Sequence, residues 1–161
     1  MIPDNVITHF KKSFGSEPAF VVRSPGRVNL LGEHVDYNDG WVLPAAIDRA
    51  VYLAVRRDDS RLASVCALDM NEAATFRVTE TTDRKDVKGD PLPGWTLYPA
   101  GVAHVLRDAG LAVSGMDAVY SSDVPRGAGL SSSAAVELAF AVAWRELDGW
   151  QKNGMELALL C

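Results

Sequence analysis

The segment from Ser132 to Leu147 constrains the fold more than any other part of this chain. Alanine, valine, leucine and phenylalanine fill most of its positions, so apolar side chains lie nearly all round the helix that it predicts. A helix that is apolar on every side is stable when it is buried. The sequence therefore predicts a folded domain that encloses this helix.

The rest of the chain supplies strands first and helices later. Apolar residues at helical spacing fill 6–14, and runs of β-forming residues fill 20–23, 50–56, 64–68, 75–78 and 116–120. Two more helices are predicted over 96–108 and 154–161, and the polar segment 79–94 is expected to be an exposed excursion. This mixture favours the α+β class over a regular α/β alternation.

Length and composition narrow the class of protein. A chain of 161 residues, 48% hydrophobic, is long enough for one domain with a substantial core. Its net charge of −5 argues against broad nucleic-acid binding, which needs a basic face. Two cysteines, Cys66 and Cys161, are too few for a disulfide scaffold. With no bilayer-spanning apolar run and no signal-peptide pattern, we expect a cytoplasmic protein without a membrane partner.

A dense polar cluster follows the first predicted strand, where Arg27, Glu33, His34 and Asp36 lie within ten residues. The carboxylates can accept hydrogen bonds from vicinal hydroxyls, and the guanidinium offers a fixed fork of donors for phosphate. The cluster therefore favours a site for a polyhydroxylated or phosphorylated ligand. Two alternatives stay open: a surface loop held by an arginine–carboxylate pair, and a metal site built from Glu33, His34 and Asp36.

A glycine- and serine-rich loop precedes the buried helix. Its residues are Gly127, Ala128, Gly129, Leu130, Ser131, Ser132 and Ser133. The glycines allow positive φ, and the serines sit where free N–H groups and the positive end of the helix dipole favour anions. Because no Lys-Ser/Thr pair follows the glycines, this is not a Walker A loop. A simple glycine turn with a serine N-cap is the alternative; together, the loop and the polar cluster point to a small-molecule kinase.

Two aromatic residues, Trp95 and Tyr98, stand near the start of the helix predicted over 96–108. They could flank an adenine ring, but packing in the core is the favoured interpretation.

Both motifs resemble those of a known family. Residues 26–40 resemble the signature of galactokinases, and residues 125–135 resemble the ATP-binding motif of the wider GHMP kinase superfamily. The resemblance implies ATP- and Mg²⁺-dependent phosphorylation of the anomeric hydroxyl of α-D-galactose, giving galactose 1-phosphate. It also implies a fold like domain 2 of ribosomal protein S5.

Residue roles follow from the same resemblance. Arg27 matches the family's transition-state arginine, and Glu33, His34 and Asp36 match its sugar-binding stretch. Gly127 to Ser133 match its nucleotide loop, with Ser133 at the position of a magnesium ligand. ATP and galactose are the implied partners.

The family pattern also extends past this chain. Its catalytic aspartate and magnesium-binding glutamate are expected beyond Cys161, and the final helix carries no stop signal. Residues 1–161 are thus expected to form a truncated GHMP N-terminal domain without the C-terminal domain. We predict that this piece is inactive alone and self-associates through apolar surface of the helix over 132–147.

Two other functions fit the same motifs. One is a kinase for another sugar, such as N-acetylgalactosamine or arabinose. The other is a non-catalytic sensor that binds galactose and ATP and regulates transcription.

Overall fold

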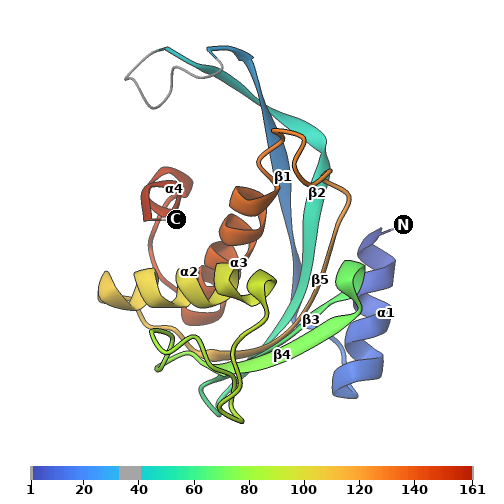
Figure 1. Cartoon of the computed structure of the whole chain (residues 1–161), viewed down its shortest axis with the longest axis vertical. Helices are drawn as coiled ribbons and strands as arrows, with labels where there is room; N and C mark the ends of the chain where they lie inside the picture. Colours follow the sequence, from blue (N-terminus) through green and yellow to red (C-terminus); the bar gives the residue numbers. More distant parts are fainter. Residues whose placement is uncertain (1, 33–40, 161) are drawn as a thin grey trace.

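A mixed five-stranded sheet organises the chain (Figure 1). The computed structural model describes residues 2–32 and 41–160. The strands lie in the order β1-β2-β5-β3-β4; β3 and β5 run parallel, and the other neighbours are antiparallel. Their bounds are β1 Phe20–Leu31, β2 Leu43–Asp58, β3 Leu62–Ala67, β4 Glu72–Arg77 and β5 Gly115–Ser122.

Helices cover both faces of this sheet. α1 (Ile2–Phe14) packs on one face, whereas α2 (Leu97–Asp108) and α3 (Ser132–Asp148) lie on the other, with α4 (Gly154–Leu160) beside α3 (Figure 1). Two short 3-10 turns complete the elements: η2 (Leu68–Met70) follows β3, and η3 (Gly94–Thr96) precedes α2. The GHMP-type α+β expectation agrees with this mixture of sheet and helix. In the described part of the chain, no helix has the length and apolarity needed to cross a bilayer.

Each face of the sheet has its own hydrophobic core. The smaller core joins Val6 and Phe10 of α1 to Ala54 and Val119 of the sheet. The larger core lies under α2 and α3 and contains a row of contacting rings. Ring centroids in this row are 5.9 Å apart for Trp95–Tyr120, 6.0 Å for Tyr120–Phe140 and 6.0 Å for Phe140–Trp144.

The prediction of a buried alanine-rich helix is confirmed. The buried side chains of α3 are Ala135, Ala139, Phe140, Ala141, Ala143 and Trp144. The helix ends at Gly149, whose φ of +73° is readily adopted by glycine, and whose N–H donates to the Arg145 carbonyl at 2.8 Å. Small alanine side chains let this helix approach the sheet closely, and α3 packs against β1 and β2.

Strands β1 and β2 are much longer than the sequence pattern predicted. β1 continues past Pro25 as far as Leu31, and β2 already begins at Leu43, before Ala50. Pro25 does not end the pairing, because it lies in an edge strand, where its missing N–H interrupts little of the ladder. The register shifts between Pro25 and Arg27, as at a β-bulge. Arg27 therefore lies on a strand and not in a loop, which corrects the expectation for this motif.

The outer part of the β1–β2 pair extends beyond the other strands (Figure 1). Residues 43–49 of β2 pair only with β1, and large apolar side chains are exposed there. They are Leu30, Leu31, Trp41, Val42 and Leu43. The sequence predicted self-association through exposed apolar surface of the helix over 132–147. Among the described residues, however, no large hydrophobic side chain of α3 is exposed.

Candidate active site

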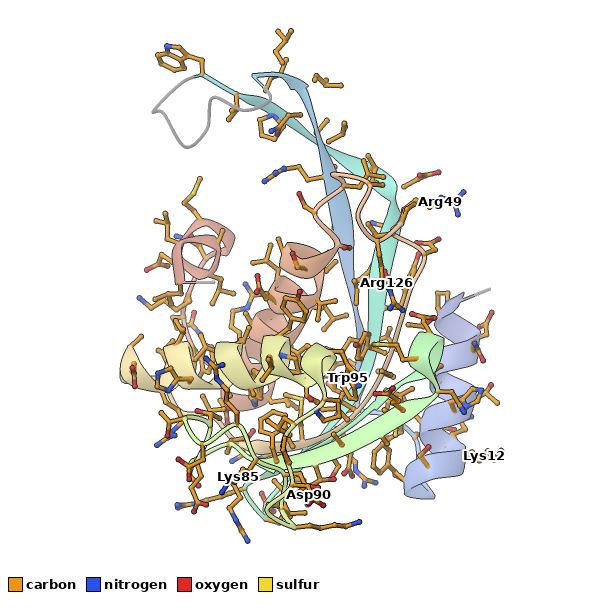
Figure 2. All side chains as sticks on the ribbon, viewed as in Figure 1. Lys12, Arg49, Lys85, Asp90, Trp95 and Arg126 are labelled. Carbon is orange, nitrogen blue, oxygen red and sulfur yellow. The ribbon has the colours of Figure 1, made fainter. Side chains whose placement is uncertain are left out.

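A pocket of about 370 Å³ opens at the N-terminal end of α3. Its wall brings together segments that are far apart in sequence: the η2 turn, the start of α2, the end of β5 and the glycine–serine loop. The lining residues are Asp69, Met70, Trp95, Tyr98, Tyr120, Ser122, Val124, Arg126, Gly127, Ser132, Ser133 and Val136. Figure 2 labels two of them, Trp95 and Arg126. Pockets that combine an aromatic wall with a few polar groups are typical of small-molecule sites.

The glycine–serine loop has the backbone conformation that the sequence predicted. Gly127 and Gly129 have φ of +70° and +71°, and Ser131, at the N-cap of α3, also has a positive φ of +57°. The Ser131 hydroxyl makes no capping hydrogen bond, so the simple serine N-cap of the alternative interpretation is absent. The first intrahelical bond there runs from the Ala135 N–H to the Ser131 carbonyl at 3.0 Å. The preceding N–H groups of α3 are therefore available to an acceptor from outside the helix.

The two sequence motifs meet through the backbone. The N–H of Arg27 on β1 donates to the carbonyl of Leu130 in the glycine–serine loop at 3.1 Å. Gly26 makes this approach possible: a Cβ added there would lie 2.9 Å from the Leu130 carbonyl oxygen. A side chain at this position would push the loop away from the strand. Arg27 and the loop are consequently held as one unit beside the pocket.

The aromatic wall of the pocket is formed by Trp95 and Tyr98, for which the sequence left adenine contact and core packing as alternatives. Trp95 is only 9% exposed and belongs to the larger core, and its indole N–H donates to Glu72 Oε2 at 2.7 Å. Tyr98 is 42% exposed. Both residues line the pocket, so core packing fixes the tryptophan while its edge remains available to a ligand.

Polar groups at the floor of the pocket are held in fixed positions. Asp69 accepts from the Ser121 hydroxyl at 2.6 Å and from the Ser122 N–H at 2.7 Å. Burial raises the pKa of the Tyr120 phenol far above its usual value; the negative charge of Asp69 adds to the rise, and the positive charge of Arg126 opposes it. Tyr120 therefore stays protonated at neutral pH, so it contributes an uncharged ring and hydroxyl.

The structure brings together part of the site that the sequence predicted. Gly127, Ser132 and Ser133 line the pocket, and Ala128, Gly129, Leu130 and Ser131 belong to the same loop. The side chain of Arg27 is exposed, and among the described residues no hydrogen bond or ion pair engages its guanidinium. Glu33, His34 and Asp36 lie outside the described residues.

Several lining residues were not predicted from the sequence. Arg126 lies inside the 125–135 motif and Tyr120 on the strand that precedes it, so their place in the chain could have indicated them. Asp69 and Met70 carry no local signal, because only the packing of η2 against β5 brings them to the pocket.

The described residues offer oxygen atoms suited to a hard cation but no complete metal site. No group of three or more His, Cys, Asp or Glu side chains that could hold a metal occurs in residues 2–32 and 41–160. The Ser133 hydroxyl and the Asp69 carboxylate both line the pocket. Mg²⁺ is commonly held by one or two protein oxygens together with substrate phosphates and water, so this donor set fits a shared site.

Comparisons with known proteins agree with this arrangement. Residues 8–57 match the galactokinase galactose-binding signature, and residues 98–161 match the N-terminal domain of GHMP kinases. A galactokinase from Roseiflexus sp. (strain RS-1) is 46% identical over 153 residues, which are 94% of this chain and 37% of that protein. The chain belongs to the galactokinase family. A second member, from Streptomyces coelicolor, is 41% identical over 94% of this chain and 38% of its own length.

Solved structures agree with this membership in the galactokinase family. Lactococcus lactis galactokinase, complexed with galactose, superposes with a TM-score of 0.85 at 28% identity, covering 99% of this chain and 41% of that chain. Methanococcus jannaschii mevalonate kinase shares the fold, with a TM-score of 0.71 at 20% identity, over 88% of this chain and 44% of its own. The galactokinase-family chain described here therefore spans less than half the length of these relatives.

Proposed function

We propose that the protein containing this chain transfers the γ-phosphoryl group of ATP to the anomeric hydroxyl of α-D-galactose, giving galactose 1-phosphate. The hydrogen bond between the Arg27 N–H and the Leu130 carbonyl carries the proposal, because it fixes the sugar-signature strand to the phosphate-type loop. The galactokinases that match this chain at 41–46% identity support the choice of sugar.

The nucleotide occupies the pocket at the N-terminus of α3 in this proposal. Its phosphates accept from the free N–H groups of the first turn and from the hydroxyls of Ser132 and Ser133, where the helix dipole favours negative charge. Its base lies against Trp95 and Tyr98, which offer flat apolar surface at the same pocket. The positive φ of Gly127 and Gly129 lets the loop curve around the phosphates.

The sugar lies near the end of β1 in this proposal. Glu33, His34 and Asp36 follow Arg27 along the chain, and their carboxylate and imidazole groups suit vicinal hydroxyls. A hydroxyl of the wrong configuration would leave one of these groups unpaired, which discriminates among sugar epimers. The family resemblance supports these assignments.

Arg27 is proposed to neutralise charge on the transferring phosphoryl group. Phosphoryl transfer depends on positioning and electrostatic stabilisation more than on covalent chemistry. The Arg27 side chain is exposed while its backbone is anchored to the loop, so a guanidinium without a competing partner among the described residues can reach a ligand beside the pocket. Bidentate pairing with phosphate oxygens suits that role.

Mg²⁺ would be held by Ser133, together with the nucleotide phosphates and a carboxylate beyond Cys161 that the resemblance implies. When bound, the ion neutralises phosphate charge. Residues 1–161 are in this proposal the N-terminal domain of a two-domain GHMP kinase. Cytoplasmic location and the absence of nucleic-acid and membrane partners remain predictions.

The deciding experiment measures ADP release by the full-length protein with MgATP and a panel of sugars. Galactose, N-acetylgalactosamine, arabinose, glucose and mevalonate form the panel. We expect turnover confined to galactose and a loss of about a thousand-fold in Arg27→Ala. Arg23→Ala is the matched control, because Arg23 lies on the same strand and its side chain donates hydrogen bonds to the Asp48 carbonyl and the Tyr52 hydroxyl.

Two outcomes would replace this function. Turnover with another sugar would keep the phosphoryl-transfer role and change the substrate. Galactose and ATP binding without turnover would assign the protein to the sensor class.

A further inference from the structure

Two charged side chains line the pocket at the N-terminus of α3, and only one of them is held by hydrogen bonds within the described part of the chain. Asp69 and Arg126 are its charged lining residues. Both oxygens of Asp69 already accept hydrogen bonds, from Ser121 and Ser122. No hydrogen bond or ion pair holds the exposed Arg126 guanidinium within the part of the chain that the structure describes. The Asp69 carboxylate keeps its negative charge, but its oxygens are held by the protein, whereas the Arg126 guanidinium has its donors available to a ligand.

Arg126 lines the same pocket as the glycine–serine loop and the aromatic wall. It directly precedes Gly127, so its backbone belongs to the loop that faces the N-terminus of α3. Its charge also acts on the Tyr120 phenol, where it opposes the rise in pKa that burial and Asp69 cause. Figure 2 labels Arg126 together with Trp95, the residue of the aromatic wall. The guanidinium can thus reach the space between loop and aromatic wall.

The loop has no other cation. From Val124 to Ser133, Arg126 is the one basic residue, and no lysine follows the glycines. A helix N-terminus offers only about half a positive charge, whereas a nucleoside triphosphate carries several negative charges. A guanidinium supplies a full charge and a planar fork of donors that matches phosphate oxygens.

We propose that Arg126 binds the phosphate chain of the nucleotide, together with the N–H groups of α3. This inference rests on the proposed function, because it takes the pocket to be a nucleotide site. Arg126 acts here as a positioning residue. It holds the phosphates toward the N-terminus of α3, on the side where Arg27 is tied to the loop.

The test measures nucleotide affinity of the full-length protein by calorimetry, with MgATP, MgADP and adenosine. In Arg126→Ala we expect ATP and ADP to bind at least about ten-fold more weakly, and adenosine to bind as in the unchanged protein. Arg126→Lys keeps the charge but loses the fork, so its affinity should lie between the two. In steady-state assays, the KM for ATP should rise about ten-fold while the KM for the sugar stays unchanged.

The control variant is Arg77→Ala, which makes the same change on β4. Arg77 pairs with the exposed Glu80 at 3.6 Å and takes no part in the pocket. We expect its nucleotide affinities to equal those of the unchanged protein. Thermal melting of all variants shows whether each is folded.

Each adverse result has a separate meaning. Unchanged ATP affinity in folded Arg126→Ala, or an equal loss for ATP and adenosine, would overturn the role of Arg126 and leave the proposed function standing. An unchanged protein that binds ATP but phosphorylates no sugar would overturn the proposed function, while the ATP and adenosine series still decides on Arg126. An unchanged protein that binds no nucleotide would overturn both.

Discussion

Gly26 illustrates how a single missing side chain positions a site. A Cβ there would lie 2.9 Å from the Leu130 carbonyl oxygen, 3.0 Å from Val124 Cγ1 and 3.1 Å from Ile47 Cδ1. Since the φ of Gly26 is not positive, the constraint is steric and comes from the approach of the loop to β1. The glycine of this motif is thus explained by its neighbours across the fold.

Gly26→Ala should therefore destabilise the chain by about 1–3 kcal/mol, because part of the clash is with backbone that cannot move without shifting the loop. Urea denaturation measures the change. Gly101→Ala on α2 is the matched control: a Cβ there meets nothing within 4 Å, so the helix should be stabilised by about 0.5–1 kcal/mol. Equal stability of Gly26→Ala and the unchanged chain would contradict this steric role of the glycine.

At the scale of the element, α4 begins with a reciprocal capping box. The Glu156 N–H donates to Asn153 Oδ1 at 3.0 Å, and the Asn153 N–H donates to Glu156 Oε2 at 2.8 Å. A helix of seven residues has few internal hydrogen bonds, so its ends matter for its stability. The Asn-x-x-Glu spacing is visible in the sequence, although the helix predicted over 154–161 did not depend on it.

Removing the cap should loosen α4. Asn153→Ala is expected to cost about 1 kcal/mol and to speed amide hydrogen exchange in the first turn of α4. Asn5→Ala, the same change at an exposed position inside α1, should leave exchange in α4 unaltered. Unchanged protection in the Asn153 variant would show that packing alone holds this helix.

The same cap should respond to acid. The Asn153 N–H, and then the Lys152 ammonium, lower the pKa of the half-buried Glu156 carboxyl below its usual value. A lowered pKa in the folded chain means that the stabilisation is present above the ordinary pKa of glutamate and is lost as pH falls through the folded value. NMR titration should therefore show Glu156 deprotonating at a lower pH than a free glutamate, and Lys152→Met, which removes the ammonium that donates to Glu156, should move the midpoint upward. An unmoved midpoint in Lys152→Met would contradict the part given to the ammonium.

At the scale of the whole molecule, the proposed function makes this chain one wall of a larger site. It spans 37% of the Roseiflexus relative, and the family resemblance assigns the catalytic aspartate to sequence beyond Cys161. We predict that the purified chain releases no ADP when given galactose and MgATP, whereas the full-length protein does. Galactose-dependent ADP release by the purified chain would contradict the expectation that catalysis needs residues beyond Cys161.

Self-association of the chain also stays a prediction, but the structure places the exposed apolar surface on the β1–β2 pair and not on α3. Exposed apolar side chains gather at the outer end of the β1–β2 pair, including Leu31 and Trp41. Such a patch favours association in water. Sedimentation velocity should show a concentration-dependent increase in mass that Leu31→Ser and Trp41→Ser together reduce. Monomers at every concentration would exclude association through this patch.

The sequence predicts best where one segment decides its own structure. The apolar pattern of α3 and the positive φ of Gly127 and Gly129 are local properties, and each was predicted. The length of β1 was not predicted, because a proline is expected to end a strand unless the strand is known to lie at the edge of the sheet. The pocket floor at Asp69 was also missed, since it exists only after η2 packs against β5.

Three of the four tryptophans occupy very different surroundings. Trp144 is fully buried, Trp95 is 9% exposed at the pocket wall, and Trp41 is 96% exposed. Their emission should therefore separate into a blue component that resists acrylamide, a red component that acrylamide quenches, and an intermediate component. Of these three, only the intermediate component touches the pocket. Trp95 is thus an intrinsic fluorescent probe whose emission should change when the pocket is filled.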